Sequence, residues 1–346
     1  MTSSPDVIVI GAGVLGLCTA AELAGRGHAV TVIDPGGVNA SSVAAGMLAP
    51  ALECLSDKAG PERVALLTRA RDLWPAFAAL HGLTLHQDGV EWRDPDAGVA
   101  IARLTASGFS ARPVPGGLFT PDDWRVEVGP ALLALSRVAG VTPVRATVAR
   151  VAATAGRWRV EAADGRVWFP STLVLATGAA PPVSGLPDRI AAQVAAIEPF
   201  RGQLTPVAGA APARTLRAPG LYIVPTPSGW VAGATMEGGR RDLEPDLDVS
   251  RRQVAAAQAL SGLAGTPGEP RVGVRGGTAD GLPLAGVSGE PGLHLALAPL
   301  RNGWLLGPMV AGIVADGIEG RAPGPDAAAL DPLRFTPPAA GSGCRD

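Results

Sequence analysis

The stretch DVIVIGAGVLGLCTAAELAGRGHAVTVID, residues 6–34, decides the fold of this chain. It begins with a short run of apolar, mostly β-branched residues, which is typical of a buried parallel strand. A glycine-rich turn follows, then an apolar helical segment that Gly27 ends. A second strand-like run ends at Asp34. This order predicts a βαβ unit and therefore an α/β fold.

Three glycines in the turn, Gly11, Gly13 and Gly16, have the spacing of a dinucleotide-binding turn. The first permits the tight turn, the second lets backbone approach a pyrophosphate, and the third lets helix and strand pack closely. The N-terminus of the helix then offers free N–H groups to the diphosphate. Asp34 lies 23 residues after Gly11, where an acid binds ribose hydroxyls. Together these features favour a dinucleotide site over an ordinary glycine-rich turn.

The composition is that of a globular protein. The chain has 346 residues, 47% of them hydrophobic, and a formal net charge of −2. Its length predicts about two domains, and it has no basic run interleaved with aromatics to suggest a nucleic-acid partner. The sparse cysteines (Cys18, Cys54, Cys344) form no CxxC pair and the histidines have no metal-ligand spacing, so we expect no metal and a reducing, cytoplasmic compartment. Glu22 interrupts the apolar N-terminal stretch, so we expect no membrane segment.

The rest of the chain gives a coarse pattern of elements. Alternating residues with an Asp164-Gly165 turn predict antiparallel strands over 146–169. The other expected elements are helical periodicity over 59–82 interrupted at Pro75, a strand-like and turn-rich region over 85–120, and helices from Pro130, around 249–264 and soon after Pro308.

The glycine-rich turn alone does not distinguish FAD from NAD. Two features favour FAD. The turn lies at the extreme N-terminus, and a later strand, residues 171–180, ends in the small turn Ala176-Thr177-Gly178 that would close the same sheet. In two-domain flavoproteins the FAD domain is built from both ends of the chain. A nicotinamide enzyme is the weakest alternative.

Six motifs extend over nearly the whole chain. They are GAGVLG…TVID (11–34), SSVAAGMLAP (41–50), PFRGQL (199–204), LYIVPTPSGWVAGATM (221–236), RGGTADGLPLAG (275–286) and LRNGWLLGP (300–308). With these motifs in this order, the sequence resembles the FAD-dependent D-amino-acid oxidase superfamily, and within it the glycine oxidases of the thiamine pathway. The resemblance implies a Rossmann-like FAD-binding domain (1–85, 126–192 and 271–335), a loose tail (336–346), and an interleaved α+β substrate domain (86–125 and 193–270) with a mainly antiparallel sheet.

The resemblance also assigns residues to a non-covalent FAD. Val14 and Leu15 join the three glycines on the diphosphate turn, and Asp34 with Pro35 lies by the adenosine ribose. The remaining cofactor residues are Ala40, Ser41, Ala45, Gly46 and Met47 along the diphosphate and flavin, Val148 beside the adenine, and Arg301, Asn302, Gly303, Trp304 and Leu305 in the loop beside the flavin ring. The alternative for residues 44–46 is a tight helix start.

Three residues match substrate-binding positions of the family. Arg275 matches the arginine that clamps the substrate carboxylate, and a guanidinium can form a bidentate pair with such a group. Tyr222, the only tyrosine, matches the residue whose hydroxyl shares that carboxylate. Met236 matches a methionine of the pocket. The alternatives are that Arg275 pairs with Asp280 or another structural acid, that Tyr222 is a half-buried strand residue, and that Met236 packs in a core.

Arg301 is the only formally charged residue between Glu290 and Asp316. A buried guanidinium keeps its proton and needs an anion. We expect that anion to be the substrate carboxylate or the electron-rich side of the reduced flavin. Arg275 is favoured as the direct clamp and Arg301 as the charge on the flavin side.

The reaction implied by the resemblance is oxidation of a small amino acid, most of all glycine, with oxygen reduced to hydrogen peroxide. The imine product gives glyoxylate and ammonia, or enters thiazole assembly. Family analogy suggests a homo-oligomer. Departures at Gly220, at residues 297–303 and at Trp304 bear on substrate preference more than on flavin binding. The alternatives are a sarcosine or D-amino-acid oxidase, a dehydrogenase with another acceptor, and a flavin-binding protein without oxidase turnover.

Overall fold

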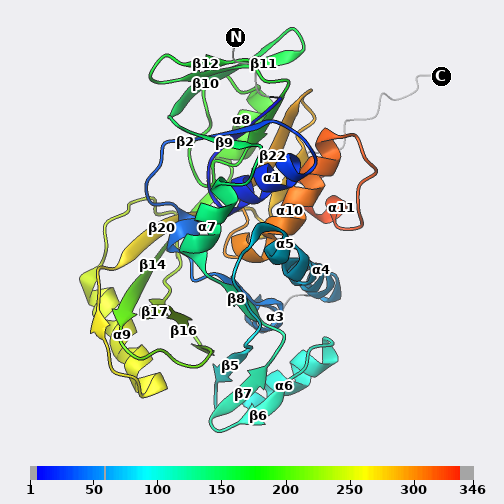
Figure 1. Cartoon of the computed structure of the whole chain (residues 1–346). Coiled ribbons are helices and arrows are strands. Elements are labelled where there is room, and N and C mark those ends of the chain that lie inside the picture. The colour runs from blue at the N-terminus through cyan, green and yellow to red at the C-terminus, as the bar shows by residue number, and fades with distance from the viewer. Residues whose placement is uncertain (1–5, 58–59, 336–346) are drawn as a thin grey trace, which may run out of the picture.

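Two large sheets organise the chain, which a computed structural model describes over residues 6–57 and 60–335. Figure 1 shows the parallel sheet and its helices above, and the larger, mainly antiparallel sheet below and to the left. The expected tail, residues 336–346, lies outside the described residues. The expected α/β class, with an antiparallel sheet beside a Rossmann-like unit, is confirmed. The domain boundaries stay a prediction.

The parallel sheet contains the βαβ unit of the opening stretch. Its strands, in spatial order, are β21 (Leu284–Val287), β22 (Leu293–Leu297), β13 (Thr172–Leu175), β1 (Val7–Ile10), β2 (Val30–Asp34) and β9 (Val141–Arg145). All are parallel except β21, which runs antiparallel to β22. The strand that ends in Ala176-Thr177-Gly178 therefore pairs with β1, as the sequence predicts.

Two helices pack against each other on this sheet, α1 (Val14–Gly25) and α10 (Gly303–Ile318). Small residues allow the close approach: a Cβ added to Gly307 would lie 3.0 Å from the Cys18 sulfur, and one added to Gly303 would lie 3.3 Å from Val14. The buried side chains on both helices make this contact part of the largest apolar core.

The last long helix begins earlier than the sequence predicts. It starts at Gly303, with Pro308 inside it, rather than after Pro308. Proline removes the hydrogen bond that its own N–H would donate to the carbonyl four residues earlier. Helix α10 keeps its course because Leu305, Leu306, Met309 and Val310 are all buried. Consequently residues 303–305 form the first turn of a helix, not a loop.

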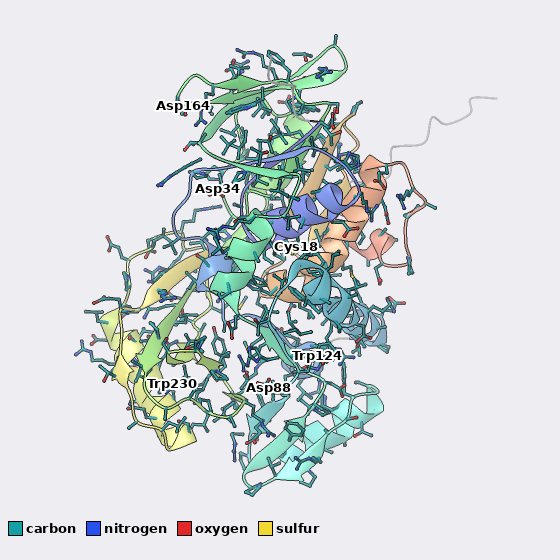
Figure 2. All side chains as sticks on the ribbon, viewed as in Figure 1. Cys18, Asp34, Asp88, Trp124, Asp164 and Trp230 are labelled. Carbon is teal, nitrogen blue, oxygen red and sulfur yellow. The ribbon has the colours of Figure 1, made fainter. Side chains whose placement is uncertain are left out.

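The large sheet has ten strands. Along its main path they are β18 (Glu237–Gly238), β14 (Glu198–Ala208), β17 (Gly229–Gly233), β16 (Leu221–Thr226), β15 (Thr215–Ala218), β5 (Val90–Arg93), β7 (Gly117–Thr120) and β6 (Arg112–Val114), and β19 (Thr266–Pro267) and β20 (Arg271–Gly277) also pair with β14. Helix α9 (Leu247–Ser261), capped by Asp246, covers one face over Trp230, which Figure 2 labels. The opposite face is left for the site.

Two three-stranded sheets complete the structure. One contains β10 (Val148–Thr154), β11 (Arg157–Ala162) and β12 (Val167–Trp168), and the other contains β3 (Met47–Leu48), β8 (Trp124–Val126) and β4 (Leu85–His86). The predicted Asp164-Gly165 turn joins β11 to β12, with Gly165 at φ 89°, and Figure 2 shows Asp164 at the rim of the molecule.

The remaining helices connect these sheets. They are α2 (Ala40–Val43), α3 (Pro50–Asp57), α4 (Pro61–Asp72), α5 (Trp74–His81), α6 (Ala97–Ala106), α7 (Val128–Ser136), α8 (Asp188–Ala195), α11 (Ala327–Leu330) and a short 3-10 helix (Pro332–Phe335). The predicted break near Pro75 separates α4 from α5. The strand-like expectation for 85–120 is wrong over α6, whose buried Leu104 anchors it. Within the described ranges, no helix is long and apolar enough to cross a bilayer.

Candidate active site

A cleft runs from the parallel sheet to the large sheet as three adjoining hollows of about 740, 90 and 250 Å³. We call them the nucleotide hollow, the neck and the charged hollow. Gly13, Ala40 and Ser41 line both the nucleotide hollow and the neck, whereas Arg275 and Arg301 line both the neck and the charged hollow. The three hollows are therefore continuous.

Nearly all residues proposed from the sequence line this cleft. The nucleotide hollow takes Gly11, Gly13, Asp34, Pro35, Ala40, Ser41 and Val148; the neck adds Val14, Leu15, Gly303 and Trp304; the charged hollow adds Ala45, Gly46, Met47, Tyr222, Met236 and Asn302. Two residues do not line it. Gly16 packs against the Gly11 carbonyl, and Leu305 is buried in the core, where its carbonyl accepts a hydrogen bond from the Trp74 indole at 3.1 Å.

The glycine-rich turn has the geometry that its sequence predicts. Gly11 has φ 112°, and a Cβ there would lie 2.3 Å from the Ala176 carbonyl oxygen. A Cβ on Gly16 would lie 2.0 Å from the Gly11 carbonyl oxygen. Helix α1 starts after Gly13, which has no side chain to cap it, and Gly13, Val14 and Leu15 at this N-terminus line the neck. An uncapped helix N-terminus beside glycine backbone fits a diphosphate.

Asp34 lines the nucleotide hollow in a fixed position, and Figure 2 shows it below the sheet of β10, β11 and β12. Its two carboxylate oxygens accept hydrogen bonds from Ala12 N–H and Gly36 N–H, both at 2.7 Å. Each oxygen keeps a further lone pair. The carboxylate can thus accept from a ribose hydroxyl pair without losing its orientation, and the hollow fits the adenosine end of FAD.

The segment after β2 crosses the neck as a short helix and a glycine turn. Asn39 and Ser42 form a reciprocal cap at the start of α2, and the Ser41 hydroxyl accepts from Val14 N–H at 2.9 Å. Gly46 has φ 74°, and a Cβ there would lie 2.3 Å from the Val126 carbonyl oxygen. Residues 44–46 therefore follow a helix, and the alternative that they begin one is wrong.

Two glycines make room for the proposed substrate-binding side chains. A Cβ on Gly202 would lie 2.1 Å from the Arg275 guanidinium, and a Cβ on Gly233 would lie 2.7 Å from the Tyr222 ring. Both side chains therefore lie flat across neighbouring strands, over backbone that has no side chain in the way. Burial raises the pKa of the Tyr222 hydroxyl, although Arg275 and Arg217 act in the opposite direction. The hydroxyl hence stays protonated and can donate to an anion.

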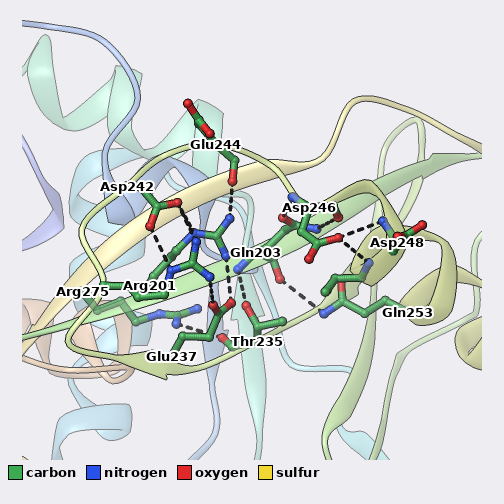
Figure 3. Close-up of polar contacts among 12 residues, drawn as sticks. Arg201, Gln203, Thr235, Glu237, Asp242, Glu244, Asp246, Asp248, Gln253 and Arg275 are labelled. Atoms are coloured by element: carbon green, nitrogen blue, oxygen red, sulfur yellow. Dashed lines mark hydrogen bonds and ion pairs between the residues drawn. The ribbon is translucent and has the colours of Figure 1, made fainter.

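Arg275 makes no ion pair within the described ranges. Its hydrogen bond there runs from Nη1 to the Thr235 carbonyl oxygen at 3.4 Å, which Figure 3 shows. The alternative that it pairs with Asp280 is wrong, because Asp280 binds Arg334 at 2.8 Å. Arg275 therefore presents its positive charge to the cleft.

Arg301 has a protein partner that the sequence analysis did not predict. Its Nε donates to Glu53, a buried carboxylate on α3 that also pairs with Arg217 at 3.3 Å. The expectation that substrate or reduced flavin supplies the anion for Arg301 is thus corrected, since Glu53 already does so. Arg301 still lines both the neck and the charged hollow.

Asp123 holds the first turn of α3, the helix that carries Glu53. It is fully buried and accepts N–H hydrogen bonds from Ala51 and Leu52 at 2.8 and 3.1 Å. Burial raises the pKa of Asp123 to about 7, although Arg217 and the two N–H groups lower it. No motif marks Glu53, Arg217 or Asp123 as site residues. The only local signal is an acid, Glu53, inside an apolar helix soon after the 41–50 motif.

Side chains of the motif PFRGQL (199–204) bind the segment 237–246 beside Arg275. Arg201 is 1% exposed and forms ion pairs with Glu237 at 2.8 Å and Asp242 at 3.1 Å (Figure 3). Gln203 both donates to and accepts from the backbone of Asp246, each at 2.7 Å. These contacts fasten residues 237–246 to β14, while the intervening Gly202 leaves the space that Arg275 fills.

Trp304 and Met236 both line the charged hollow, the first buried and the second exposed. Trp304 is buried against Trp74, and its indole donates to the Ser41 carbonyl oxygen at 3.2 Å. Met236 is 43% exposed at the rim, so the alternative of core packing does not hold. A buried indole and an exposed thioether leave the hollow open on one side.

One family model and several known proteins match this chain. The family model described as FAD dependent oxidoreductase (DAO) matches residues 6–317. Glycine oxidase from Bacillus licheniformis is 29% identical over 360 residues, covering 91% of this chain and 93% of the relative. The crystal structure of glycine oxidase from Geobacillus kaustophilus superposes with a TM-score of 0.82 at 26% identity, covering 96% and 99% of the two chains.

Longer proteins also match. The tRNA 5-methylaminomethyl-2-thiouridine biosynthesis bifunctional protein MnmC from Caulobacter sp. (strain K31) is 29% identical, and the match covers 95% of this chain but 57% of that protein. The bifunctional protein ThiO/ThiG from Synechocystis sp. is 28% identical, with 97% of this chain and 55% of that protein covered. The chain spans little more than half the length of these two relatives. With the family model matched over nearly all described residues, and the expected FAD confirmed by it, the chain belongs to the DAO family of FAD-dependent oxidoreductases.

Proposed function

We propose that the chain oxidises the amine of glycine, or of a similar small amino acid, to the imine, which hydrolyses to glyoxylate, with oxygen reduced to hydrogen peroxide. The observation that carries the proposal is Arg275, a guanidinium without an ion-pair partner among the described residues, which lines the charged hollow together with Tyr222. We place the reaction in thiamine thiazole biosynthesis, which the glycine-oxidase and ThiO/ThiG relatives support.

The residues of the charged hollow bind and orient the substrate. Arg275 holds the carboxylate by charge-assisted hydrogen bonds, and the protonated Tyr222 donates a further one. This fixes the α-carbon toward the neck, where bound FAD would accept the electron pair and later pass it to oxygen. Among the described residues, no histidine lines the charged hollow and Glu53 is the one carboxylate that does. Because Glu53 is paired with two arginines, none of these side chains serves as a free general base. The substrate amine would enter neutral.

Arg301 and the start of α10 stabilise negative charge at the neck. Arg301 is held by Glu53, and the N-terminus of α10 at Gly303 adds a positive dipole. A fixed cation close to the flavin ring favours a cofactor that becomes electron-rich. The flavin-side role assigned to Arg301 in the sequence is thus retained as a proposal, with Glu53 as its support.

Peroxide release tests the proposal. The purified yellow protein is assayed in air with glycine, sarcosine and D-alanine, and glyoxylate is measured in parallel. We expect peroxide and glyoxylate in equal amounts from glycine. Peroxide from D-alanine alone would assign a D-amino-acid oxidase. Amino-acid consumption without peroxide would assign a dehydrogenase, and the absence of any turnover would leave a flavin-binding protein.

A further inference from the structure

The charged hollow holds more positive charge than one amino-acid carboxylate neutralises. Among the described residues that line it, four side chains are formally charged: Arg217, Arg275, Arg301 and Glu53. Glu53 offsets one of the three guanidinium charges, which leaves two. A bound monocarboxylate with a neutral amine would offset one more. Among the described residues, the positive charge on the wall of the hollow then still exceeds the negative charge by one.

The position of Arg217 indicates that it carries this excess positive charge. Arg217 on β15 is the direct cross-strand partner of Tyr222 on β16, and Trp92 on β5 is its partner on the other side. Cross-strand partners project from the same face of a sheet. Trp92, Arg217 and Tyr222 accordingly form one row on the face that lines the charged hollow.

Arg275 approaches the same row from the opposite side. It comes from β20 and crosses Gly202 toward Thr235, just beyond Gly233, the partner of Tyr222 on β17. Tyr222 therefore lies between the two guanidinium groups, and its hydroxyl senses the charge of both. A ligand whose carboxylate is held by Arg275 and Tyr222 has Arg217 one strand further along the sheet.

Arg217 has spare hydrogen-bonding capacity at this place. Its Nη2 reaches Glu53 at 3.3 Å, but its Nη1 is buried and has no hydrogen-bond partner within the described residues. Leaving such a donor unsatisfied is costly. Arg301, by contrast, also lines the neck, where the cofactor is expected, whereas Arg217 lines only the charged hollow. The Arg217 side chain therefore lies on the substrate side of the cleft.

We propose that Arg217 binds a second acidic group on the substrate, so that the preferred substrates are small amino acids with an additional carboxylate on the nitrogen or the side chain. The inference rests on the proposed function for the identity of the first carboxylate. It specifies the class of substrate more narrowly, with glycine as the minimal member and N-(carboxymethyl)glycine or aspartate as members that use both arginines.

The test compares ligands that cannot be oxidised. Acetate and succinate are titrated into the holoenzyme, and their dissociation constants are read from the change in the flavin spectrum. The variants are Arg217→Gln and Arg217→Lys, and the matched control is Arg214→Gln, because Arg214 lies over the Phe119 ring and does not line the hollow. Glu53→Gln is the opposite change, since it removes the competing carboxylate.

We expect wild type to bind succinate more tightly than acetate. Arg217→Gln should raise the dissociation constant of succinate by about 10- to 100-fold, as expected for the loss of a hydrogen-bonded charge. The dissociation constant of acetate should change by less than about threefold. Arg217→Lys should weaken succinate binding by less, and its result decides the test if the glutamine variant does not fold. Glu53→Gln should make succinate bind more tightly, and Arg214→Gln should leave the dissociation constants of both ligands unchanged.

Equal binding of acetate and succinate by wild type would overturn the inference. So would an equal loss of both ligands in the Arg217 variants, because Arg217 would then serve the shared carboxylate. These readings need no turnover. A protein that binds succinate through Arg217 but is reduced by no amino acid would contradict the proposed function alone.

Discussion

The two ends of the cleft differ in the groups that line them, backbone at one end and long side chains at the other. The nucleotide hollow is made of backbone, with glycines at turns, small residues at Ala40 and Ser41, and one carboxylate, Asp34, held by two N–H groups. The charged hollow is made of long side chains, Arg217, Arg275 and Arg301, around Glu53. We propose that the first end recognises a cofactor by shape and backbone donors, and that the second recognises a substrate by charge.

This difference determines how each end responds to mutation. Adding one methyl group to the backbone end creates a steric clash that neighbouring backbone cannot relieve. Exchanging a side chain at the charged end leaves the fold largely intact and changes binding instead. The predictions below test this division, beginning with the largest effect.

Gly16→Ala should have the largest effect on folding. Its Cβ would lie 2.0 Å from the Gly11 carbonyl oxygen, and both atoms belong to fixed backbone. We expect the free energy of unfolding of the apoprotein, measured in urea, to fall by more than about 3 kcal/mol. The control is Gly25→Ala in the same helix, where no atom lies within 4 Å; this change should stabilise by up to about 1 kcal/mol. Equal effects of the two changes would show that the close approach at Gly16 is unimportant.

Arg275→Lys should reduce catalysis without loosening the cofactor. Lysine keeps the charge but loses the two-pronged geometry that matches a carboxylate. We expect kcat/KM for glycine to fall about 100-fold, with the FAD dissociation constant unchanged. Arg271→Lys, on an exposed position of the same strand, is the control and should leave both quantities as they are. Loss of FAD in the Arg275 variant would contradict the division between the two ends.

Glu53→Gln tests whether the charged end also contributes to stability. The change removes the buried anion shared by Arg217 and Arg301 and leaves two guanidinium groups uncompensated. We expect the free energy of unfolding to fall by about 2 kcal/mol. The exposed Glu62→Gln should change it by less than about 0.5 kcal/mol. A Glu53 variant as stable as wild type would mean that solvent already satisfies these arginines.

Tyr222→Phe should have the smallest effect, a loss of about tenfold in kcat/KM for one hydrogen bond to a charged group. Because burial raises the pKa of Tyr222 above its ordinary value of 10, the hydroxyl is protonated at every lower pH. The ratio of wild type to variant should therefore be constant from neutral pH up to that value. A ratio that declines on the way to pH 10 would show that the tyrosine ionises in the assay range.

The same division explains what the sequence could predict. The βαβ unit, the strand before Ala176-Thr177-Gly178 and the Asp164-Gly165 turn are local patterns, and each is confirmed. The nucleotide hollow follows from them because a glycine turn and a strand-terminal acid meet within one unit. Local patterns gave wrong predictions where packing dominates. Helix α10 continues through Pro308 because its faces are buried. Helix α6 was missed because its N-terminus has no side-chain cap that the sequence could indicate.

The charged end depends on contacts between distant segments. Glu53 and Arg301 are 248 residues apart in sequence, and Arg217 reaches them from a third segment. The family resemblance supplied Arg275, Tyr222 and Met236, which the structure brings to one hollow. For Arg301 we expected the substrate carboxylate or the reduced flavin as partner, whereas the structure gives Glu53. A lone arginine in an apolar stretch correctly indicated a buried anion. Which anion it was could not be read from spacing.

Anaerobic titration of the holoenzyme with glycine tests the central claim most directly, namely that Arg275 places the α-carbon of a small amino acid against the flavin. The account predicts that glycine bleaches the visible flavin band of wild type, and that Arg275→Met requires far more glycine for the same bleaching. A flavin band that glycine, sarcosine and D-alanine all leave unchanged in wild type would contradict it.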